Sequence, residues 1–177
     1  MRERLTGTAI ILYTLIMMVF SLTTMSLVNG QYINKKSEAL PDFMYFTLDG
    51  KKFTKADLKP DSKLLIIYFN PFCEICQEET QEVLNNINFF DDIQIVMISP
   101  NAPDEIIKFK NEFKLNDHSQ ITMLHDPSDL FYKEFKAIGY PSLFLYDENK
   151  DMIVRFDTQV DFEEIKEAFS PGMAVKK

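Results

Sequence analysis

The side chains best suited to chemistry in this sequence are its only two cysteines, Cys73 and Cys76. They are three positions apart, so one turn of helix would bring their sulfur atoms within disulfide reach. An apolar run at 64–69 precedes them, and a helical pattern begins at Cys73. A pair of this kind can act as a redox couple, as half of a metal site or as a structural crosslink.

Two of these uses find little support in the rest of the sequence. A crosslink over so short a loop would stabilise the fold by only about 2 kcal/mol, and a chain with 46% hydrophobic residues can bury a sizeable core without it. A metal site needs further ligands, and His118 and His125, the only histidines, are not spaced from the cysteines as in compact zinc modules. We therefore expect no metal and favour a redox couple, with the Cys73–Cys76 disulfide as its only redox group.

The position of the pair predicts a role for each cysteine. At the start of a helix, Cys73 lies near free backbone amides that stabilise a thiolate, and a thiolate can attack a disulfide of another molecule. Cys76, one turn further into the helix, is then placed to resolve the mixed disulfide. Glu74 lies between the two cysteines, and its negative charge disfavours the thiolate. We therefore expect a reducing couple rather than a strongly oxidising one.

The elements that must position the cysteines follow from the hydrophobic pattern. Hairpins are expected at 42–53, around the Asp49–Gly50 turn, and at 142–156. Buried strands are expected at 64–69, 93–99 and 121–124, and helices at 73–90, 103–113, 128–137 and 161–169. This order predicts an α/β fold with a mixed central sheet, helices on both faces and the cysteines at the carboxyl end of a central strand.

Two of these helices carry more detailed predictions. The helix at 128–137 is expected to begin with Ser128 or Asp129 as its cap and to end near Gly139. The helix at 73–90 is expected to turn one apolar face toward the core. That face would consist of Ile75, Val83, Leu84, Ile87 and Phe90.

Residues 1–30 have the layout of an export signal. Arg2 and Arg4 precede an apolar stretch at 9–20, and a more polar segment leads to Gly30. Residues 8–28 are also about as long as the ~20 residues that span a bilayer, so residues 1–30 are either a signal peptide or an N-terminal membrane anchor. Both alternatives place residues 31–40, as a tether, and 41–177, as the folded domain, in the periplasm or at the outer face of the cytoplasmic membrane.

The charge balance argues against one class of partner. The chain has 27 acidic and 19 basic residues, a net charge of −8. Nucleic-acid binding draws on clustered lysine and arginine, which this balance does not offer. We therefore expect protein partners and no nucleic acid.

Two stretches of the sequence resemble the thioredoxin superfamily. Residues 69–79, Phe-Asn-Pro-Phe-Cys-Glu-Ile-Cys-Gln-Glu-Glu, are similar to the active-site segment of its exported TlpA/ResA-like thiol-disulfide oxidoreductases, a branch related to the AhpC/TSA redoxins. Residues 138–147, Ile-Gly-Tyr-Pro-Ser-Leu-Phe-Leu-Tyr-Asp, are similar to the cis-proline loop and the strand after it. The resemblance covers about residues 40–170 and implies a thioredoxin-like three-layer fold with an N-terminal β-hairpin.

The resemblance also implies roles for individual residues. Cys73 would be the nucleophile, Cys76 the resolving thiol, Glu79 an acid that handles protons near the pair, and Pro141 a cis residue whose loop faces the sulfur atoms. Glu79 has support from spacing as well, because a residue three positions beyond Cys76 can share its side of the helix. Without the resemblance, Glu79 would be taken for a solvated helix residue and Pro141 for a trans proline.

Client binding is expected at Phe72, Glu74, Tyr140 and Pro141. The expected partners are disulfides of exported proteins and a membrane thiol donor of the DsbD/CcdA kind that restores the dithiol. Four positions depart from the family pattern. Phe72 replaces the usual tryptophan, and Ile75 replaces a common proline. Gln81 falls where a helix proline is frequent, and Ile67 stands where thioredoxin itself buries an acid. These departures bear on the redox potential and the range of clients rather than on the fold.

Two other functions fit the same fold. A thiol peroxidase of the peroxiredoxin kind would have a threonine shortly before its reactive cysteine, but Asn70, Pro71 and Phe72 precede Cys73. A non-enzymatic assembly factor or metallochaperone would use the fold as a scaffold. Binding of Cu(I) by Cys73, Cys76 and His125 without reductase turnover would favour the second alternative.

Overall fold

A seven-stranded mixed β-sheet forms the centre of the structure, a computed structural model that describes residues 38–170. The strand order is β2-β1-β5-β4-β3-β6-β7. The bounds are β1 Met44–Thr47, β2 Lys52–Thr54, β3 Lys63–Tyr68, β4 Ile93–Ser99, β5 Ile121–His125, β6 Ser142–Tyr146 and β7 Met152–Phe156. β3, β4 and β5 pair in parallel and the other neighbours pair antiparallel. The predicted mixed sheet with an N-terminal hairpin is confirmed.

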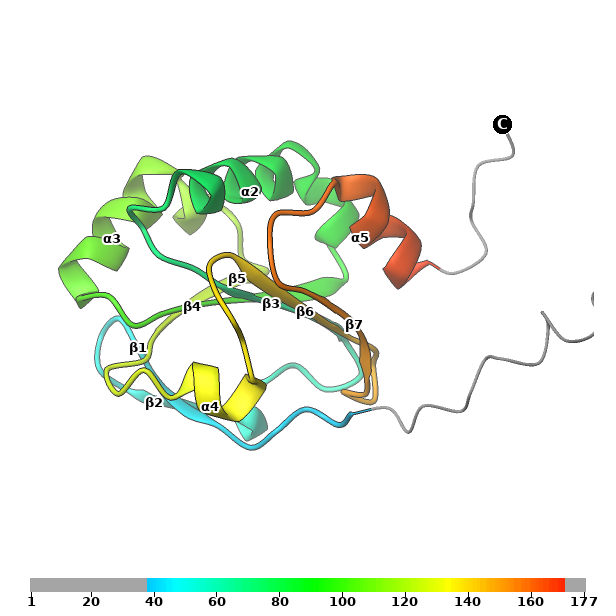
Figure 1. Cartoon of the computed structure of the whole chain (residues 1–177), viewed down its shortest axis with the longest axis horizontal. Helices are drawn as coiled ribbons and strands as arrows, with labels where there is room; N and C mark the ends of the chain where they lie inside the picture. The colour runs from blue at the N-terminus through cyan, green and yellow to red at the C-terminus, as the bar shows by residue number, and fades with distance from the viewer. Residues whose placement is uncertain (1–37, 171–177) are drawn as a thin grey trace, which may run out of the picture. The chain divides into compact units, whose positions relative to one another are not determined.

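Helices cover both faces of this sheet. They are α2 (Glu74–Asn85), α3 (Pro103–Glu112), α4 (Phe131–Phe135) and α5 (Phe162–Phe169). In Figure 1, α2, α3 and α5 lie over one face and the short α4 lies over the other. The α2 and α3 crossovers connect the parallel strands β3, β4 and β5, as parallel pairing requires. The three layers are those of the predicted thioredoxin-like fold.

The side chains of β3 show why its sequence is apolar without alternation. Leu65 and Ile67 pack in one core with α2, α3 and α5, while Leu64, Ile66 and Tyr68 pack in a second core with α4 and β1. A strand with helices over both faces buries every side chain, so its sequence loses the alternation typical of a half-exposed strand. β3 therefore holds the segment that follows it between two packed layers.

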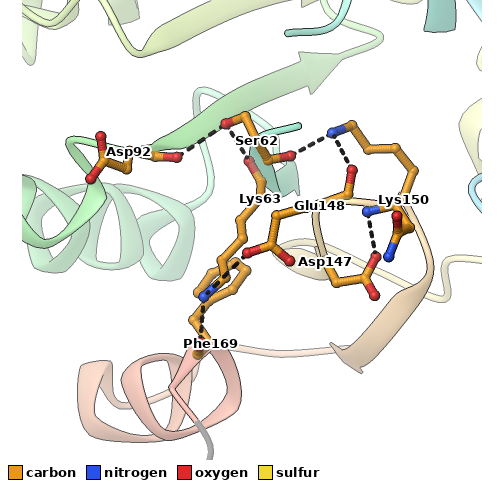
Figure 2. Close-up of polar contacts among 8 residues, drawn as sticks. Ser62, Lys63, Asp92, Asp147, Glu148, Lys150 and Phe169 are labelled. Atoms are coloured by element: carbon orange, nitrogen blue, oxygen red, sulfur yellow. Dashed lines mark hydrogen bonds and ion pairs between the residues drawn. The ribbon is translucent and has the colours of Figure 1, made fainter. Parts of the chain in front are cut away.

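The end of the sheet where β3 begins carries a cluster of polar contacts, drawn in Figure 2. Lys63 Nζ donates a hydrogen bond of 2.7 Å to the carbonyl oxygen of Phe169, the last residue of α5, and lies 3.8 Å from Glu148 Oε1. Lys150 Nζ donates to the carbonyl oxygen of Ser62. These contacts fasten α5 and the β6–β7 turn to the start of the central strand.

The described chain enters the fold along the edge of β7. Ala39 forms an antiparallel bridge with Asp151, and Leu40 is buried. Only the last three residues of the predicted tether, 31–40, are therefore described, and the predicted signal peptide or anchor at 1–30 lies outside the described residues. Within residues 38–170, no helix is both long enough and apolar enough to cross a membrane.

The helix predicted at 73–90 is shorter than expected. α2 ends at Asn85, and Ile87–Phe90 form a 3₁₀ turn instead. The side chain of Asn86 explains the ending, because its Nδ2 donates a 2.9 Å hydrogen bond to the carbonyl oxygen of Glu82 and so takes up an acceptor at the helix end. Ile75, which was expected in the apolar face, is 45% exposed. That part of the prediction is wrong, because Ile75 belongs to the first turn, beside the cysteines.

The helix predicted at 128–137 is limited to α4, and its cap differs from the prediction. Asp126, rather than Ser128 or Asp129, accepts a 2.9 Å hydrogen bond from the backbone N–H of Phe131. Lys136, with a φ of 54°, ends the helix in the left-handed conformation before the chain reaches Gly139. The buried carboxylate of Asp126 and the packing of Phe131 and Phe135 decide where this helix lies.

Candidate active site

The cysteines follow β3 after a tight turn that begins at Asn70. The Asn70 side chain accepts a 2.9 Å hydrogen bond from the backbone N–H of Phe72, and its carbonyl oxygen accepts one of 3.1 Å from the N–H of Cys73. This Asx-type turn, followed by Pro71, reverses the chain at the end of the strand. Gln77 Nε2 donates a 2.9 Å hydrogen bond to the carbonyl oxygen of Pro71, which ties the turn to the first turn of α2.

Cys73 caps the N-terminus of α2. Its Sγ accepts a 3.3 Å hydrogen bond from the backbone N–H of Cys76 and lies 4.0 Å from the carbonyl oxygen of Tyr140. Both cysteines are free thiols, and Cys73 is partly exposed. The nucleophile expected from the sequence thus lies between the positive end of a helix and the loop of Pro141.

Cys76 is in a different environment from Cys73. Only 1% of its surface is exposed. Burial raises the pKa of the Cys76 thiol to about 12, and the negative charge of Glu79 adds to this effect. A thiol that holds its proton this firmly needs a base to become a nucleophile. The two sulfur atoms are therefore unequal in access, and Cys76 depends on its surroundings for deprotonation.

Glu79 supplies a carboxyl group one helical turn beyond Cys76. It is completely buried, and burial raises its pKa from its ordinary value near 4.5 to about 7. Its Oε2 accepts a 3.0 Å hydrogen bond from the backbone N–H of Val160, in the loop before α5, whereas Oε1 has no hydrogen-bond partner among the described residues. A carboxyl group with this pKa can both take up and release a proton near neutral pH.

The loop that carries Pro141 faces the cysteines from the start of β6. The peptide bond between Tyr140 and Pro141 is cis, as the family resemblance implies. Pro141 is buried, and Ser142 Oγ donates a 2.8 Å hydrogen bond to the carbonyl oxygen of Gly139. The sequence-distant residues Cys73 and Tyr140 are brought together because β3 and β6 are neighbours in the sheet, with Tyr68 opposite Ser142.

The Tyr140 side chain is held by a chain of hydrogen bonds that the sequence did not suggest. Its hydroxyl donates a hydrogen bond of 3.2 Å to the hydroxyl of Tyr68, and the Tyr68 hydroxyl donates one to the carboxylate of Asp129. The rings of Tyr68 and Tyr140 lie 4.8 Å apart, and Tyr68 stacks on Phe131 of α4 at 4.3 Å. The loop at Pro141 is thereby fastened to α4 on the opposite face of the sheet.

Two of the expected client-binding residues lie on the surface beside Cys73. Phe72 is 69% exposed, and Glu74 is exposed as well. Ile138, which the sequence analysis did not single out, is 73% exposed in the loop before Pro141. Asn70, Gln77, Tyr68, Asp129 and Val160 were also missed. Of these, Asn70 had a local signal, because an Asn-Pro pair at a strand end marks a turn.

The histidines are not part of this arrangement. Cys73 follows β3, whereas His125 ends β5, and β4 lies between these two strands. In the described part of the chain, no group of three or more His, Cys, Asp or Glu residues is placed to hold a metal ion. The Cys73, Cys76 and His125 set considered for Cu(I) is therefore not assembled in this fold.

A comparison with models of protein families shows to which family the chain belongs. The model of the AhpC/TSA family matches residues 37–156, which include β1 to β7, both cysteines and Pro141. The chain belongs to the AhpC/TSA family. This membership confirms the resemblance to the thioredoxin superfamily and supports a thioredoxin-like redox function. A comparison with the curated proteins gives no match.

Solved structures of similar shape agree with the fold. A candidate thiol:disulfide interchange protein DsbE of Chlorobium tepidum superimposes with a TM-score of 0.65 at 16% identity, covering 76% of this chain and 94% of that one. A secreted disulfide oxidoreductase of Mycobacterium tuberculosis, homologous to DsbE of E. coli, gives 0.61 at 18%, covering 71% and 92%. DsbF of M. tuberculosis gives 0.64 at 18%, covering 75% and 96%. At these identities the likeness establishes the fold of this family member.

Proposed function

We propose that this AhpC/TSA family member is a thiol-disulfide oxidoreductase that reduces or exchanges disulfides of exported proteins through Cys73 and Cys76. The observation that carries the proposal is the inequality of the two sulfur atoms. Cys73 is partly exposed, with its Sγ between the start of α2 and the loop of Pro141, while Cys76 is 1% exposed. An accessible sulfur can reach a client disulfide, and a shielded one can react only within the molecule.

The proposed reaction has two exchange steps. The Cys73 thiolate attacks one sulfur of a client disulfide, forming a mixed disulfide and releasing the first client thiolate. Cys76 then loses its proton to the Glu79 carboxylate and attacks Cys73 Sγ, which releases the second client thiolate. Two electrons pass from the protein dithiol to the client disulfide, and the protein is left with a Cys73–Cys76 disulfide. Phe72, Glu74, Tyr140 and Pro141 are the proposed contacts of the client chain.

The proposed reaction needs a source of electrons and a location. A membrane thiol donor of the DsbD/CcdA kind would reduce the Cys73–Cys76 disulfide again. Residues 1–30, as a cleaved signal or as an anchor through residues 8–28, would place residues 31–177 in the periplasm or at the outer face of the cytoplasmic membrane. The likeness to a secreted disulfide oxidoreductase of M. tuberculosis supports this location.

The roles of the two cysteines are tested by trapping. The full chain with Cys76→Ala is expected to accumulate mixed disulfides with its clients through Cys73, because nothing resolves them. Cys73→Ala is expected to trap none, and the double variant is the control for unrelated crosslinks. The products are separated on non-reducing gels after rapid alkylation of free thiols, and the partners are identified by mass spectrometry. Equal trapping by both single variants would contradict the assigned roles.

The same preparations separate the alternatives. Rapid oxidation of the reduced chain by micromolar peroxide, without exchange with disulfides, would support the peroxidase. Stoichiometric Cu(I) binding without exchange would support the assembly factor. No described contact favours either alternative: Asn70 and Pro71 form a turn before Cys73, and His125 lies two strands away.

A further inference from the structure

The charges around the cysteines are distributed very unevenly. Between Lys63 and Lys108 the sequence has no lysine or arginine, although it contains the whole of α2 and β4. The same stretch carries eight acidic residues: Glu74, Glu78, Glu79, Glu82, Asp91, Asp92, Asp104 and Glu105. The helix that Cys73 caps, α2, therefore has acidic side chains and no basic ones.

Three of these carboxylates form a row on α2. Glu74, Glu78 and Glu82 are spaced four residues apart, so they lie one above the other on the helix, within roughly 12 Å of its start. Like charges at this spacing repel one another and destabilise a helix. Among residues 38–170, no ion pair involves a carboxylate of α2. The row is thus a source of negative potential that the described protein leaves uncompensated.

A fourth carboxylate lies near this row. Asp161, the exposed residue that precedes α5, raises the pKa of Glu79 through its negative charge, as does Glu82. Both therefore lie close enough to the buried acid to act on it. Negative charge from two elements of the fold is therefore gathered around Glu79 on α2.

Exposed apolar side chains accompany the carboxylates. Phe72 and Ile75, on either side of Cys73 in the sequence, are 69% and 45% exposed. Ile138, in the loop whose Tyr140 carbonyl lies beside Cys73 Sγ, is 73% exposed. Large apolar side chains in a small exposed group around a reactive sulfur are typical of an interaction site rather than of inert surface.

We propose that the surface formed by Phe72, Ile75, Ile138, Glu74 and Glu78 selects client segments in which apolar and cationic residues flank the reacting disulfide. The inference rests on the proposed function and adds the class of client to it. Lysine or arginine of the client would compensate the carboxylate row, and apolar residues would cover Phe72 and Ile138. An acidic client segment would meet the same row with repulsion.

Three peptide disulfides test the selection. Each is a disulfide-linked dimer of Phe-X-Cys-X-Phe, with X as lysine, glutamine or glutamate. The fully reduced full chain is mixed with each dimer, and the single-turnover rate of exchange is followed by the appearance of peptide thiol. Every rate is divided by the rate with neutral 2-mercaptoethanol, which corrects for the intrinsic reactivity of the three dimers. Low salt and high salt are compared, because screening shortens the range of the charges.

The lysine dimer is expected to react about tenfold faster than the glutamate dimer at low salt, a size typical of electrostatic steering. The ratio is expected to fall to about twofold or less at 1 M salt, where charges act over only about 3 Å. The paired substitution Glu74→Gln with Glu78→Gln should lower the ratio in the same way. A change in Cys73 reactivity alone would alter all three rates equally and leave the ratio unchanged.

The matched control removes the same charge elsewhere. Asp91→Asn with Asp92→Asn acts at two exposed positions just before β4, at the opposite end of the sheet from the cysteines, and should keep the ratio. Equal normalised rates for the three dimers, or a ratio that the control changes as much as the glutamine pair does, would overturn the client selection while leaving the oxidoreductase intact. Failure of all three dimers to react would instead overturn the proposed function.

Discussion

Glu79 holds a carboxyl group in a place that water does not reach, with one oxygen on the Val160 amide and the other without a partner in the described structure. A buried carboxylate is costly, so the group prefers to keep its proton, and the pKa of about 7 expresses this preference. Functional groups are often held in such unfavourable positions, where the rest of the fold supports them. The effect of the buried Glu79 carboxyl group on stability can be measured.

The pKa of Glu79 predicts how stability changes with pH. Because the pKa is raised in the folded state, the stabilising contribution is complete below the unfolded value of about 4.5 and is lost as the pH rises through about 7. The reduced protein should therefore lose up to about 3 kcal/mol, relative to Glu79→Gln, between pH 4 and pH 8. Urea unfolding of both proteins across this range checks the prediction. Parallel stability curves for the two proteins would contradict it.

A chain of hydrogen bonds through Tyr68 and Tyr140 connects the start of α4 with the loop of Pro141. Tyr68 lies on β3, Asp129 precedes α4, and Tyr140 precedes Pro141, so three separate segments meet at one string of hydroxyl groups. The stacking of Tyr68 on Phe131 adds an apolar contact to the same junction. The loop that faces Cys73 therefore depends on a helix from the other face of the sheet.

Removing the Tyr68 hydroxyl tests this connection. Tyr68→Phe keeps the stacked ring but breaks both hydrogen bonds, and is expected to cost about 1 kcal/mol of unfolding free energy. Mixed-disulfide formation with a peptide disulfide should slow about fivefold because the loop loses its fixed position, a factor that corresponds to the same energy. Tyr146→Phe is the control, since the Tyr146 hydroxyl is buried without a hydrogen-bond partner in the described residues. If Tyr68→Phe and Tyr146→Phe exchange at the same rate, the chain does not position the loop.

The elements differ in how well the sequence predicts them. The buried strands are confirmed nearly residue for residue, and β6 and β7 together span the hairpin predicted at 142–156. Runs of Val, Ile, Leu and Phe between turn residues determine such strands locally. α4 was predicted too long and with the wrong cap. Its start depends on the hydrogen bond from Phe131 to Asp126, and Asp126 directly follows the strand β5. Helix ends set by such contacts have no local signal.

The residues of the candidate site also differ in how well the sequence predicts them. Cys73, Cys76 and Glu79 share one helix and could be placed by their spacing, and Pro141 by a family motif. Val160, Tyr68 and Asp129 reach the site only through pairing and packing of segments far apart in the chain. Their types are ordinary for their positions, so no pattern in a single sequence would distinguish them.

The two ends of the sheet carry different features of the molecule. The end where β3 begins carries the contacts of Lys63 and Lys150 drawn in Figure 2, and the end where β3 finishes carries the cysteines. Six residues, five of them in β3, separate Lys63 from the turn at Asn70. Changes at the first end should therefore alter stability without altering the chemistry.

Lys63→Met tests this separation. The variant keeps the apolar stem but loses the hydrogen bond to the Phe169 carbonyl, which is expected to cost about 1–2 kcal/mol of unfolding free energy. The rate of exchange with a peptide disulfide should stay within about twofold of that of the unchanged chain, because a site more than 10 Å away with no shared contacts acts independently. Denaturant unfolding and single-turnover exchange measure the two effects. A large loss of exchange rate at unchanged stability would contradict it.

The bridge between Ala39 and Asp151 has a consequence for where the described chain enters the fold. Asp151 lies beside the start of β7, opposite the end of β6, and so at the end of the sheet that lies away from Cys73. The first described residues therefore meet the sheet at the end opposite the dithiol. The entry of the described chain into the fold therefore leaves the opposite end of the sheet, with Cys73 and Cys76, clear of it.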